Sequence, residues 1–259
     1  MQVILQNCDA VDISWLNDFL AIHGLRELPE SKDVPAGHDG LVLIATEGGL
    51  SLSAATDLQT LPTRVDFLAG SLRHRLATSS RHEGLPKAAG LDKAREPLHV
   101  LDATAGLGID AFQLAAMGCH ITLLEKSPVM AALLADGLRR GRNTGDADTR
   151  AALDRMTLHA VEARDWFMQL RDEHRPDVIY LDPMFPPRQK SAKVKKDMAL
   201  MQRFLPPNED IDELVSQARL QARKRVVLKR PGKVDRKALP KPDFQVPGKA
   251  CHFQVFLCN

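Results

Sequence analysis

Downstream of residue 97, short apolar runs alternate with stretches whose apolar residues recur every three to four positions. This alternation is typical of a parallel sheet whose strands are connected by helices. It predicts a doubly wound, mostly parallel α/β sheet. The expected strands are residues 99–101, 121–124, 157–160, 178–181, 225–229 and 252–257.

One predicted helix carries start and stop signals. Ser127 is expected at the N-cap and Pro128 at the first helical position, while Arg139, Arg140 and Gly141 are expected at the C-terminal end. A helix is also expected at about 211–222, and another one across the apolar positions 111–115. These helices supply the crossovers that parallel strands require.

The first 97 residues have a different pattern and predict a small N-terminal α+β domain, with residues 98–259 as the main domain. Residues 41–45 and 50–53, joined through residues 47–49, predict a β-hairpin. The apolar spacing of residues 65–76 predicts a helix.

Composition excludes several classes of protein. With 259 residues and 44% apolar content, the chain can bury a full core. It begins without a basic leader and has no apolar run long enough for a membrane span, so we expect a cytoplasmic protein with no membrane partner. The four cysteines are scattered along the chain and predict neither a disulfide framework nor a metal site.

Charge is unevenly distributed although the formal net charge is only +2. Residues 219–237 contain nine Lys or Arg and one Asp, and residues 188–197 contain five and one. The rest of the chain is therefore acidic overall. Such concentration of positive charge is the pattern expected of a nucleic-acid-binding surface.

A glycine-bearing turn follows the first strand of the main domain. Asp102 ends that strand, and Gly106 and Gly108 precede the next helix. Glycines at this place let a ligand approach the backbone and the helix N-terminus. With Ala111, the turn also satisfies the dinucleotide fingerprint G-x-G-x-x-A, so the turn alone does not identify the cofactor.

Three carboxylates favour S-adenosylmethionine over a dinucleotide. Asp110 falls in the first helical turn, where it would repel a pyrophosphate but suit a ligand with an ammonium and a sulfonium. Asp102 can serve the same cationic tail. Glu125, at the tip of the second strand, is placed to accept the ribose hydroxyls.

The fourth strand predicts the catalytic position, because it ends in Asp182-Pro183-Met184-Phe185 at the edge where open α/β sheets bind ligands. An aromatic amine is a poor nucleophile, since its lone pair is delocalised into the ring. The Asp182 side chain and the Pro183 carbonyl could accept hydrogen bonds from its N–H groups and so localise the lone pair on nitrogen. Phe185 could stack on the base.

A basic segment directly follows this motif, and we expect it to contact RNA phosphates beside the bound base. A solvated charge run is the alternative interpretation. The residues concerned are Arg188, Lys190, Lys193, Lys195 and Lys196.

The chain resembles the ribosomal RNA small subunit methyltransferase J family in four sequence runs. They are LDATAGLGIDAFQLAAMG, YLDPMFPPRQKSAKVKKDM, KRVVLKRP and, upstream of these, VDFLAGSLRHR. The resemblance implies a class I, Rossmann-like methyltransferase that acts on N2 of a guanosine near the 3′ end of small-subunit (16S) rRNA. It also implies that rRNA, or a 30S-type particle, is the partner, with no metal. The implied cofactor contacts are Ile109, Asp110, Glu125, Lys126, Val161, Glu162 and Asp182.

Other functions remain open at this point. A methyltransferase that acts on another nucleic-acid amine, such as adenine N6, would use the same Asp-Pro-aromatic motif to bind and orient that amine. A nucleotide-dependent oxidoreductase would place Asp110 in its phosphate site, and a non-catalytic RNA-binding module would need no cofactor.

Overall fold

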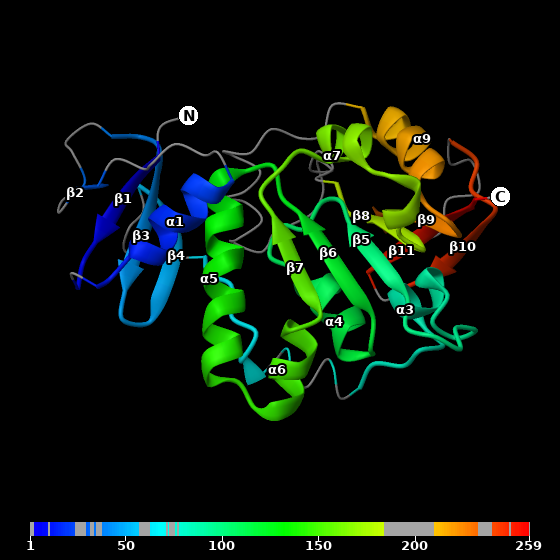
Figure 1. The fold of residues 1–259 in the computed structure, drawn as a ribbon, viewed down its shortest axis with the longest axis horizontal. Helices are drawn as coiled ribbons and strands as arrows, with labels where there is room; N and C mark the ends of the chain where they lie inside the picture. The colour runs from blue at the N-terminus through cyan, green and yellow to red at the C-terminus, as the bar shows by residue number, and fades with distance from the viewer. Residues whose placement is uncertain are drawn as a thin grey trace.

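The large sheet forms the centre of the molecule in the computed structural model (Figure 1). The structure describes residues 3–9, 11–23, 30–31, 34, 38–56, 63–70, 72, 76, 78–183, 210–232, 240–248 and 250–258. The strand order of the large sheet is β10-β11-β9-β8-β5-β6-β7. Its strands are β5 (His99–Asp102), β6 (His120–Leu124), β7 (Met156–His159), β8 (Val178–Leu181), β9 (Arg225–Pro231), β10 (Phe244–Pro247) and β11 (Cys251–Leu257). The five strands from β9 to β7 are parallel, and the pairings β10–β11 and β11–β9 are antiparallel.

Alternate residues of these strands supply two separate cores, as the two-residue period of a β-strand requires. Val100, Tyr180 and Val227 belong to one apolar cluster, whereas their neighbours Leu101 and Leu181 belong to the other. The first cluster packs under α3 (Gly84–Ala89), α4 (Ile109–Ala116), α5 (Pro128–Thr144) and α6 (Ala147–Leu153). The second packs under α7 (Ala163–Gln169) and α9 (Ile211–Gln221), and a short 3-10 helix (Asp172–His174) precedes β8. The predicted doubly wound α/β sheet is thus confirmed.

The helix α5 begins as its sequence signals predict. Pro128 is its first residue, and the Ser127 hydroxyl accepts a hydrogen bond from the Met130 amide at 3.5 Å. The predicted end at Gly141 is wrong, because the helix continues to Thr144. Gly141 packs inside the structure, where an added Cβ would lie 2.4 Å from Leu153. This glycine therefore serves close helix packing and does not end the helix.

A second, smaller sheet contains the N-terminal strands in the order β2-β1-β3-β4 (Figure 1). Its strands are β1 (Val3–Asn7), β2 (Glu30–Ser31), β3 (Leu41–Thr46) and β4 (Gly49–Ala54), and α1 (Ser14–Ile22) accompanies them. The strands β3 and β4 form the predicted antiparallel hairpin. The helix predicted from residue 65 is wrong at its start, because residues 64–69 form a loop and a turn.

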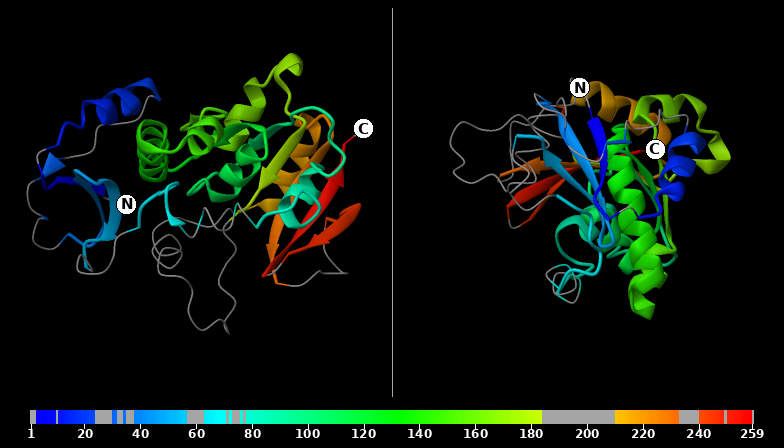
Figure 2. Two further views of the ribbon diagram at one scale, coloured as in Figure 1. Left: turned by 90° about the horizontal axis from the view of Figure 1, so that it is seen from below. Right: turned by 90° about the vertical axis from the view of Figure 1, so that its left-hand side faces the viewer.

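The buried carboxylate of Asp136 joins the small sheet to α5. It accepts hydrogen bonds from the Leu50 amide of β4 at 3.0 Å and from Arg140 Nε at 2.7 Å, while Arg140 also donates to the Val65 carbonyl. Figure 2 shows α5 between the small sheet and the rest of the molecule. The domain boundary near residue 97 stays a prediction. The helix α3, which lies before that boundary, packs against β9, β10 and β11.

Candidate active site

The carboxyl ends of the parallel strands bring a group of charged side chains together. Asp102 and Asp182 each lie two positions beyond a residue of the α4-side core, namely Val100 and Tyr180, and Lys229 follows Val227 in the same way. Strand alternation therefore directs all three toward the face covered by α4. Because Leu181 pairs with Leu228, Asp182 and Lys229 are the next positions in register.

Lys229 connects two carboxylates at this edge. Its Nζ atom lies 2.7 Å from Asp110 Oδ2 and 2.7 Å from Asp182 Oδ2. The buried Tyr180 hydroxyl donates a third hydrogen bond, to Asp110 Oδ2 at 2.7 Å. Asp110 lies in the first turn of α4, as predicted, so one helix and two strands converge on this ion-pair group.

The turn between β5 and α4 is held by the neighbouring strand. The Gly106 amide donates to Glu125 Oε2 at 2.9 Å, and the Ser127 amide donates to Glu125 Oε1 at 2.7 Å. Gly106 has a φ of 53°, in the left-handed region that glycine adopts readily. Among the described residues, an added Cβ there would meet nothing nearer than the Thr104 carbonyl at 3.9 Å, which leaves room for a ligand on this side of the turn.

Thr104 links the turn to the predicted catalytic strand end. Its hydroxyl accepts a hydrogen bond from the Asp182 amide at 2.6 Å, and its own amide donates to Asp102 Oδ1 at 3.1 Å. The β5 turn and the end of β8 are therefore fixed relative to each other. The predicted cofactor turn and the predicted catalytic position form a single site.

Burial shapes the ionisation of the acids in this site. It raises the pKa of Asp102 to about 8, and the nearby carboxylates of Asp110, Asp182 and Glu125 add to that effect. Burial also raises the pKa of Glu125, against the opposing effect of the Ser127 and Gly106 amides. For Lys229, burial would lower the pKa, but Asp110 and Asp182 together raise it above its ordinary value.

Burial raises the pKa of Asp182 as well, and the Lys229 ammonium opposes that rise. The described part of the site thus contains four acids, Asp102, Asp110, Glu125 and Asp182, and one bridging cation. Asp102 is largely protonated at neutral pH because of its raised pKa, but Asp110 and Asp182 still share a single ammonium, which favours a ligand that carries positive charge and disfavours a pyrophosphate.

The end of β7 contacts the N-terminal region of the chain. Glu162 caps α7, with its Oε2 atom accepting from the Arg164 amide at 2.7 Å, and Val161 precedes it. Nδ1 of His23, just after α1, lies 3.4 Å from the Ala160 amide, which donates to it. The ring of His23 also meets the edge of the His159 ring, with 6.4 Å between the centroids.

Several predicted site residues lie outside the described residues. They are Phe185 and the basic set Arg188, Lys190, Lys193, Lys195 and Lys196. The basic residues 223–225 are described, and each has a structural partner. Arg223 donates to the Glu173 carbonyl, Lys224 pairs with Asp177, and Arg225 donates to the Ala88 carbonyl.

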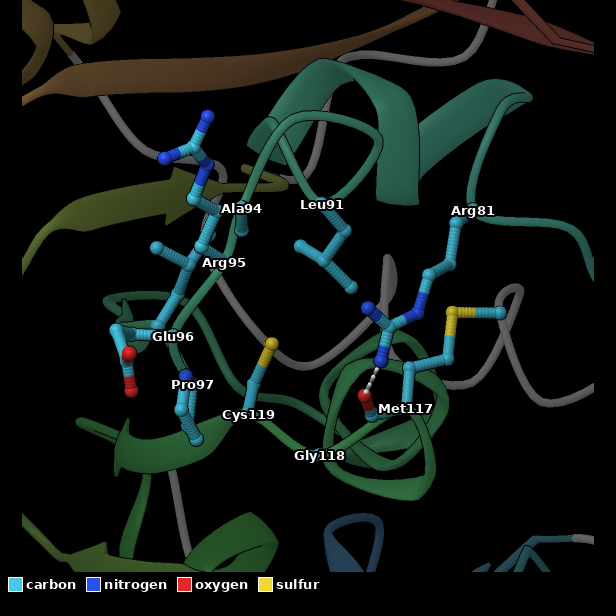
Figure 3. Close-up of a pocket in the computed structure, with 10 residues that line it drawn as sticks. Arg81, Leu91, Ala94, Arg95, Glu96, Pro97, Met117, Gly118 and Cys119 are labelled. Atoms are coloured by element: carbon cyan, nitrogen blue, oxygen red, sulfur yellow. Dashed lines mark hydrogen bonds between the residues drawn. The ribbon is translucent and has the colours of Figure 1, made fainter.

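A separate cavity of about 220 Å³ lies at the opposite, amino-terminal edge of the large sheet (Figure 3). Leu98 and Cys119, which directly precede β5 and β6, contribute to its wall. Arg81 closes one side and donates to the Met117 carbonyl at 2.7 Å. Burial raises the pKa of the Cys119 thiol to about 11, so this cysteine is not a reactive thiolate.

Comparison with known proteins identifies the family of this chain. Residues 32–258 match the sequence model of the family described as "Putative SAM-dependent methyltransferase". A relative from Thioalkalivibrio sulfidiphilus, named ribosomal RNA small subunit methyltransferase J, is 46% identical over 218 residues, which are 84% of each chain. A relative of the same name from Alteromonas mediterranea is 38% identical and covers 99% of this chain and 96% of its own.

This chain belongs to the ribosomal RNA small subunit methyltransferase J family.

A crystal structure of a SAM-dependent methyltransferase from Neisseria gonorrhoeae has the same fold, with a TM-score of 0.73 and 27% identity over 99% of this chain and 96% of that one. The chain is accordingly a methyltransferase whose cofactor is S-adenosylmethionine. The site fits this cofactor, since the Gly106 turn, which has room for a ligand among the described residues, lies beside two carboxylates that share one ammonium. Within the described residues no group of His, Cys, Asp and Glu could hold a metal ion, and no helix is long and apolar enough to cross a membrane.

The sequence interpretation missed three residues that contact the predicted acids. Lys229, Tyr180 and Thr104 each contact one of the predicted acids directly. A weak signal for Lys229 was present in the sequence, because it is the first charged residue after the buried run 226–228. The signals for Tyr180 and Thr104 are weaker, since a strand tyrosine and a turn threonine occur in many proteins.

Proposed function

We propose that this methyltransferase transfers a methyl group from S-adenosylmethionine to the exocyclic N2 of a guanosine in small-subunit (16S) rRNA. The observation that carries the proposal is the carboxylate of Asp182. It stands at the end of β8, where the Asp182 backbone amide donates to the Thr104 hydroxyl of the glycine turn and the carboxylate is linked to α4 through Lys229. The family relationship adds the rRNA substrate, because relatives carry that substrate in their names.

The chemistry follows from what each group does to the amine. The Asp182 carboxylate and the Pro183 carbonyl accept hydrogen bonds from the N–H groups of the amine. These bonds localise the nitrogen lone pair and point it at the methyl group. The carboxylate also stabilises the positive charge that develops on nitrogen during transfer. When bound, the cofactor supplies an electrophilic methyl group on its sulfonium. Phe185 stacks on the target base in this proposal.

The remaining acids hold the cofactor. Asp102 and Asp110 face the positively charged amino-acid tail. Glu125 accepts the ribose hydroxyls, for which a carboxylate has lone pairs left after its two backbone hydrogen bonds. Ile109, Lys126, Val161 and Glu162 complete the proposed contacts, and Gly106 lets the cofactor approach the backbone. An added Cβ at Gly108 would lie 2.8 Å from Leu134, so that glycine serves close packing and the positive φ of the turn.

The substrate partner is rRNA, either alone or within a 30S-type particle. The proposed RNA contacts are those of the basic segment after the catalytic motif, namely Arg188, Lys190, Lys193, Lys195 and Lys196. Their charges would neutralise phosphates near the target base, which predicts binding that weakens steeply with salt.

The test is analysis of the methylated nucleoside. Small-subunit RNA that lacks the modification is incubated with the protein and S-adenosylmethionine, digested to nucleosides and analysed by mass spectrometry. N2-methylguanosine is the expected product, and the Asp182→Asn variant should form far less of it. N6-methyladenosine would instead identify adenine as the target and overturn the proposed substrate.

A further inference from the structure

Lys229 is the cation in a group of ionisable side chains that face Asp182 from several elements. Among the described residues these are Asp102 of β5, Asp110 of α4, Tyr180 of β8 and Lys229 of β9. The Oδ2 atoms of Asp110 and Asp182 both lie 2.7 Å from Lys229 Nζ, so they cannot be further apart than twice that distance. Two carboxylates this close in a largely buried site disfavour each other's charge.

The ammonium between them removes this conflict. It donates to both carboxylates at once, and 27% of its side chain is exposed, against 12% for Asp110 and 37% for Asp182, so solvent screens the pair with Asp110 weakly and the pair with Asp182 more strongly. Among the described residues, Lys229 engages Oδ2 of Asp182, which leaves Oδ1 for the incoming amine in the proposed reaction. The ion pair also restricts rotation of the carboxylate, since Lys229 itself is fixed by β9 and by Asp110.

We infer that Lys229 is a positioning residue for methyl transfer: by bridging Asp110 and Asp182, it keeps the Asp182 carboxylate charged and oriented toward the amine. This inference rests on the proposed role of Asp182. Lys229 cannot act as a base here, because the two carboxylates hold its proton firmly. Lys229 instead sets the charge and the orientation of the Asp182 carboxylate, which accepts the hydrogen bonds of the amine.

The inference predicts a change in pH dependence. Without the ammonium, nothing opposes the effect of burial and of the Asp110 charge, which both raise the pKa of Asp182. Asp182 then loses its proton only at higher pH. In Lys229→Met, the acid limb of the single-turnover rate should move upward by about one pH unit or more, measured at saturating cofactor and RNA. Lys229→Arg keeps the positive charge and should return the limb close to that of the parent protein.

A second readout needs neither cofactor nor turnover. Carboxyl carbon resonances of the aspartates are followed by NMR against pH in the protein alone, with Asp182 assigned by its loss in Asp182→Asn. Its titration should move to higher pH in Lys229→Met. It should move to lower pH in Asp110→Asn, which removes the competing carboxylate and also serves if Lys229→Met does not fold.

The matched control is Lys224→Met, which removes a similar ion pair with Asp177 at the other end of the same two strands. It should leave the Asp182 titration and the pH profile unchanged. An Asp182 titration unmoved by both Lys229→Met and Asp110→Asn would overturn the inference. So would Lys229→Met with weaker S-adenosylhomocysteine binding but the parent pH profile, since Lys229 would then only bind the cofactor. A product other than N2-methylguanosine would refute the proposed substrate alone, because the pH test follows transfer to any amine.

Discussion

The two ends of the strand pair β8 and β9 carry similar ion pairs with different surroundings. At the amino end, Lys224 lies 2.9 Å from Asp177, with more than half of the lysine side chain exposed, and the charge of Arg223 also acts on that carboxylate. At the carboxyl end, Lys229 serves two acids, and the buried Asp102 and Glu125 lie nearby. The first pair is electrically balanced by the protein itself. The second end has an excess of negative charge that a cationic ligand can neutralise.

The partners at the amino end explain its structural character. Asp177 also accepts a hydrogen bond from the His99 amide at 3.0 Å, and Arg223 and Arg225 donate to carbonyls of neighbouring segments. These groups fasten the starts of the strands to the rest of the fold. Charge excess, and not the presence of a lysine–aspartate pair, therefore distinguishes the functional end of the sheet.

The largest effect is expected from Asp182→Asn, which keeps the shape of the side chain but removes its charge. Losing one preorganised electrostatic contact commonly lowers the rate by about 10²–10³. Single-turnover kinetics at saturating RNA and cofactor isolate this step from binding. Asp177→Asn at the opposite end is the control and should keep the parent rate. An Asp182→Asn rate within threefold of the parent would remove Asp182 from the transfer step.

The next effect concerns cofactor affinity. Glu125→Ala removes the proposed acceptor of the ribose hydroxyls and also releases the Gly106 amide that shapes the turn. A lost charge-assisted hydrogen bond predicts S-adenosylhomocysteine binding weaker by roughly 1.5–3 kcal/mol. Calorimetric titration measures it directly. Unchanged affinity would exclude Glu125 from the cofactor site.

A third prediction concerns stability against pH. The fold raises the pKa of Asp102 from 3.8 to about 8, mainly through burial and then through Asp110, Asp182 and Glu125. Between these values the folded protein retains a proton that the unfolded chain has released, so the free energy of unfolding falls as pH rises. Asp102→Asn cannot ionise and should flatten this fall by up to about 1.4 kcal/mol per pH unit. Urea unfolding of both proteins from pH 5 to 8.5 measures the difference, and parallel curves would contradict it.

The smallest effect is expected at the balanced end. Lys224→Met breaks a pair whose lysine is more than half exposed, and Asp177 keeps its hydrogen bond from the His99 amide, so the free energy of unfolding should fall by no more than about 1 kcal/mol. The single-turnover rate should not change. A rate loss comparable to that of Asp182→Asn would show that the two ends do not differ in function as described.

The fold of the main domain could be predicted because its strands are short, apolar and separated by helical spacing. β8 has the predicted bounds, and β5, β6, β7, β9 and β11 differ from prediction by only one or two residues at an end. The short elements β10, α6 and α7 were missed, since four to seven residues give little periodic signal. The start of the helix predicted from Val65 is wrong because tertiary contacts decide the conformation there. The Val65 carbonyl binds Arg140, and its side chain fills the space beside Gly137.

The candidate site could be predicted in part for a related reason. Asp102, Glu125 and Asp182 follow strands, and parallel strands end at a common edge, so their meeting needs only the strand assignment. The bridge from Lys229 to Asp110 depends in addition on β9 lying beside β8, which the sequence pattern does not specify. Short-range spacing therefore predicted the acids but not the cation that organises them.

The most direct test of the account is to map the rRNA modification in cells. Small-subunit rRNA from a strain that lacks this gene is compared with rRNA from the parent strain by mass spectrometry of defined fragments. One guanosine should lose its N2-methyl group, and it should regain it when the strain produces the unaltered protein or Lys224→Met, but not when it produces Asp182→Asn at an equal level. An unchanged methylation pattern in the deletion strain, or full restoration by Asp182→Asn, would contradict the account.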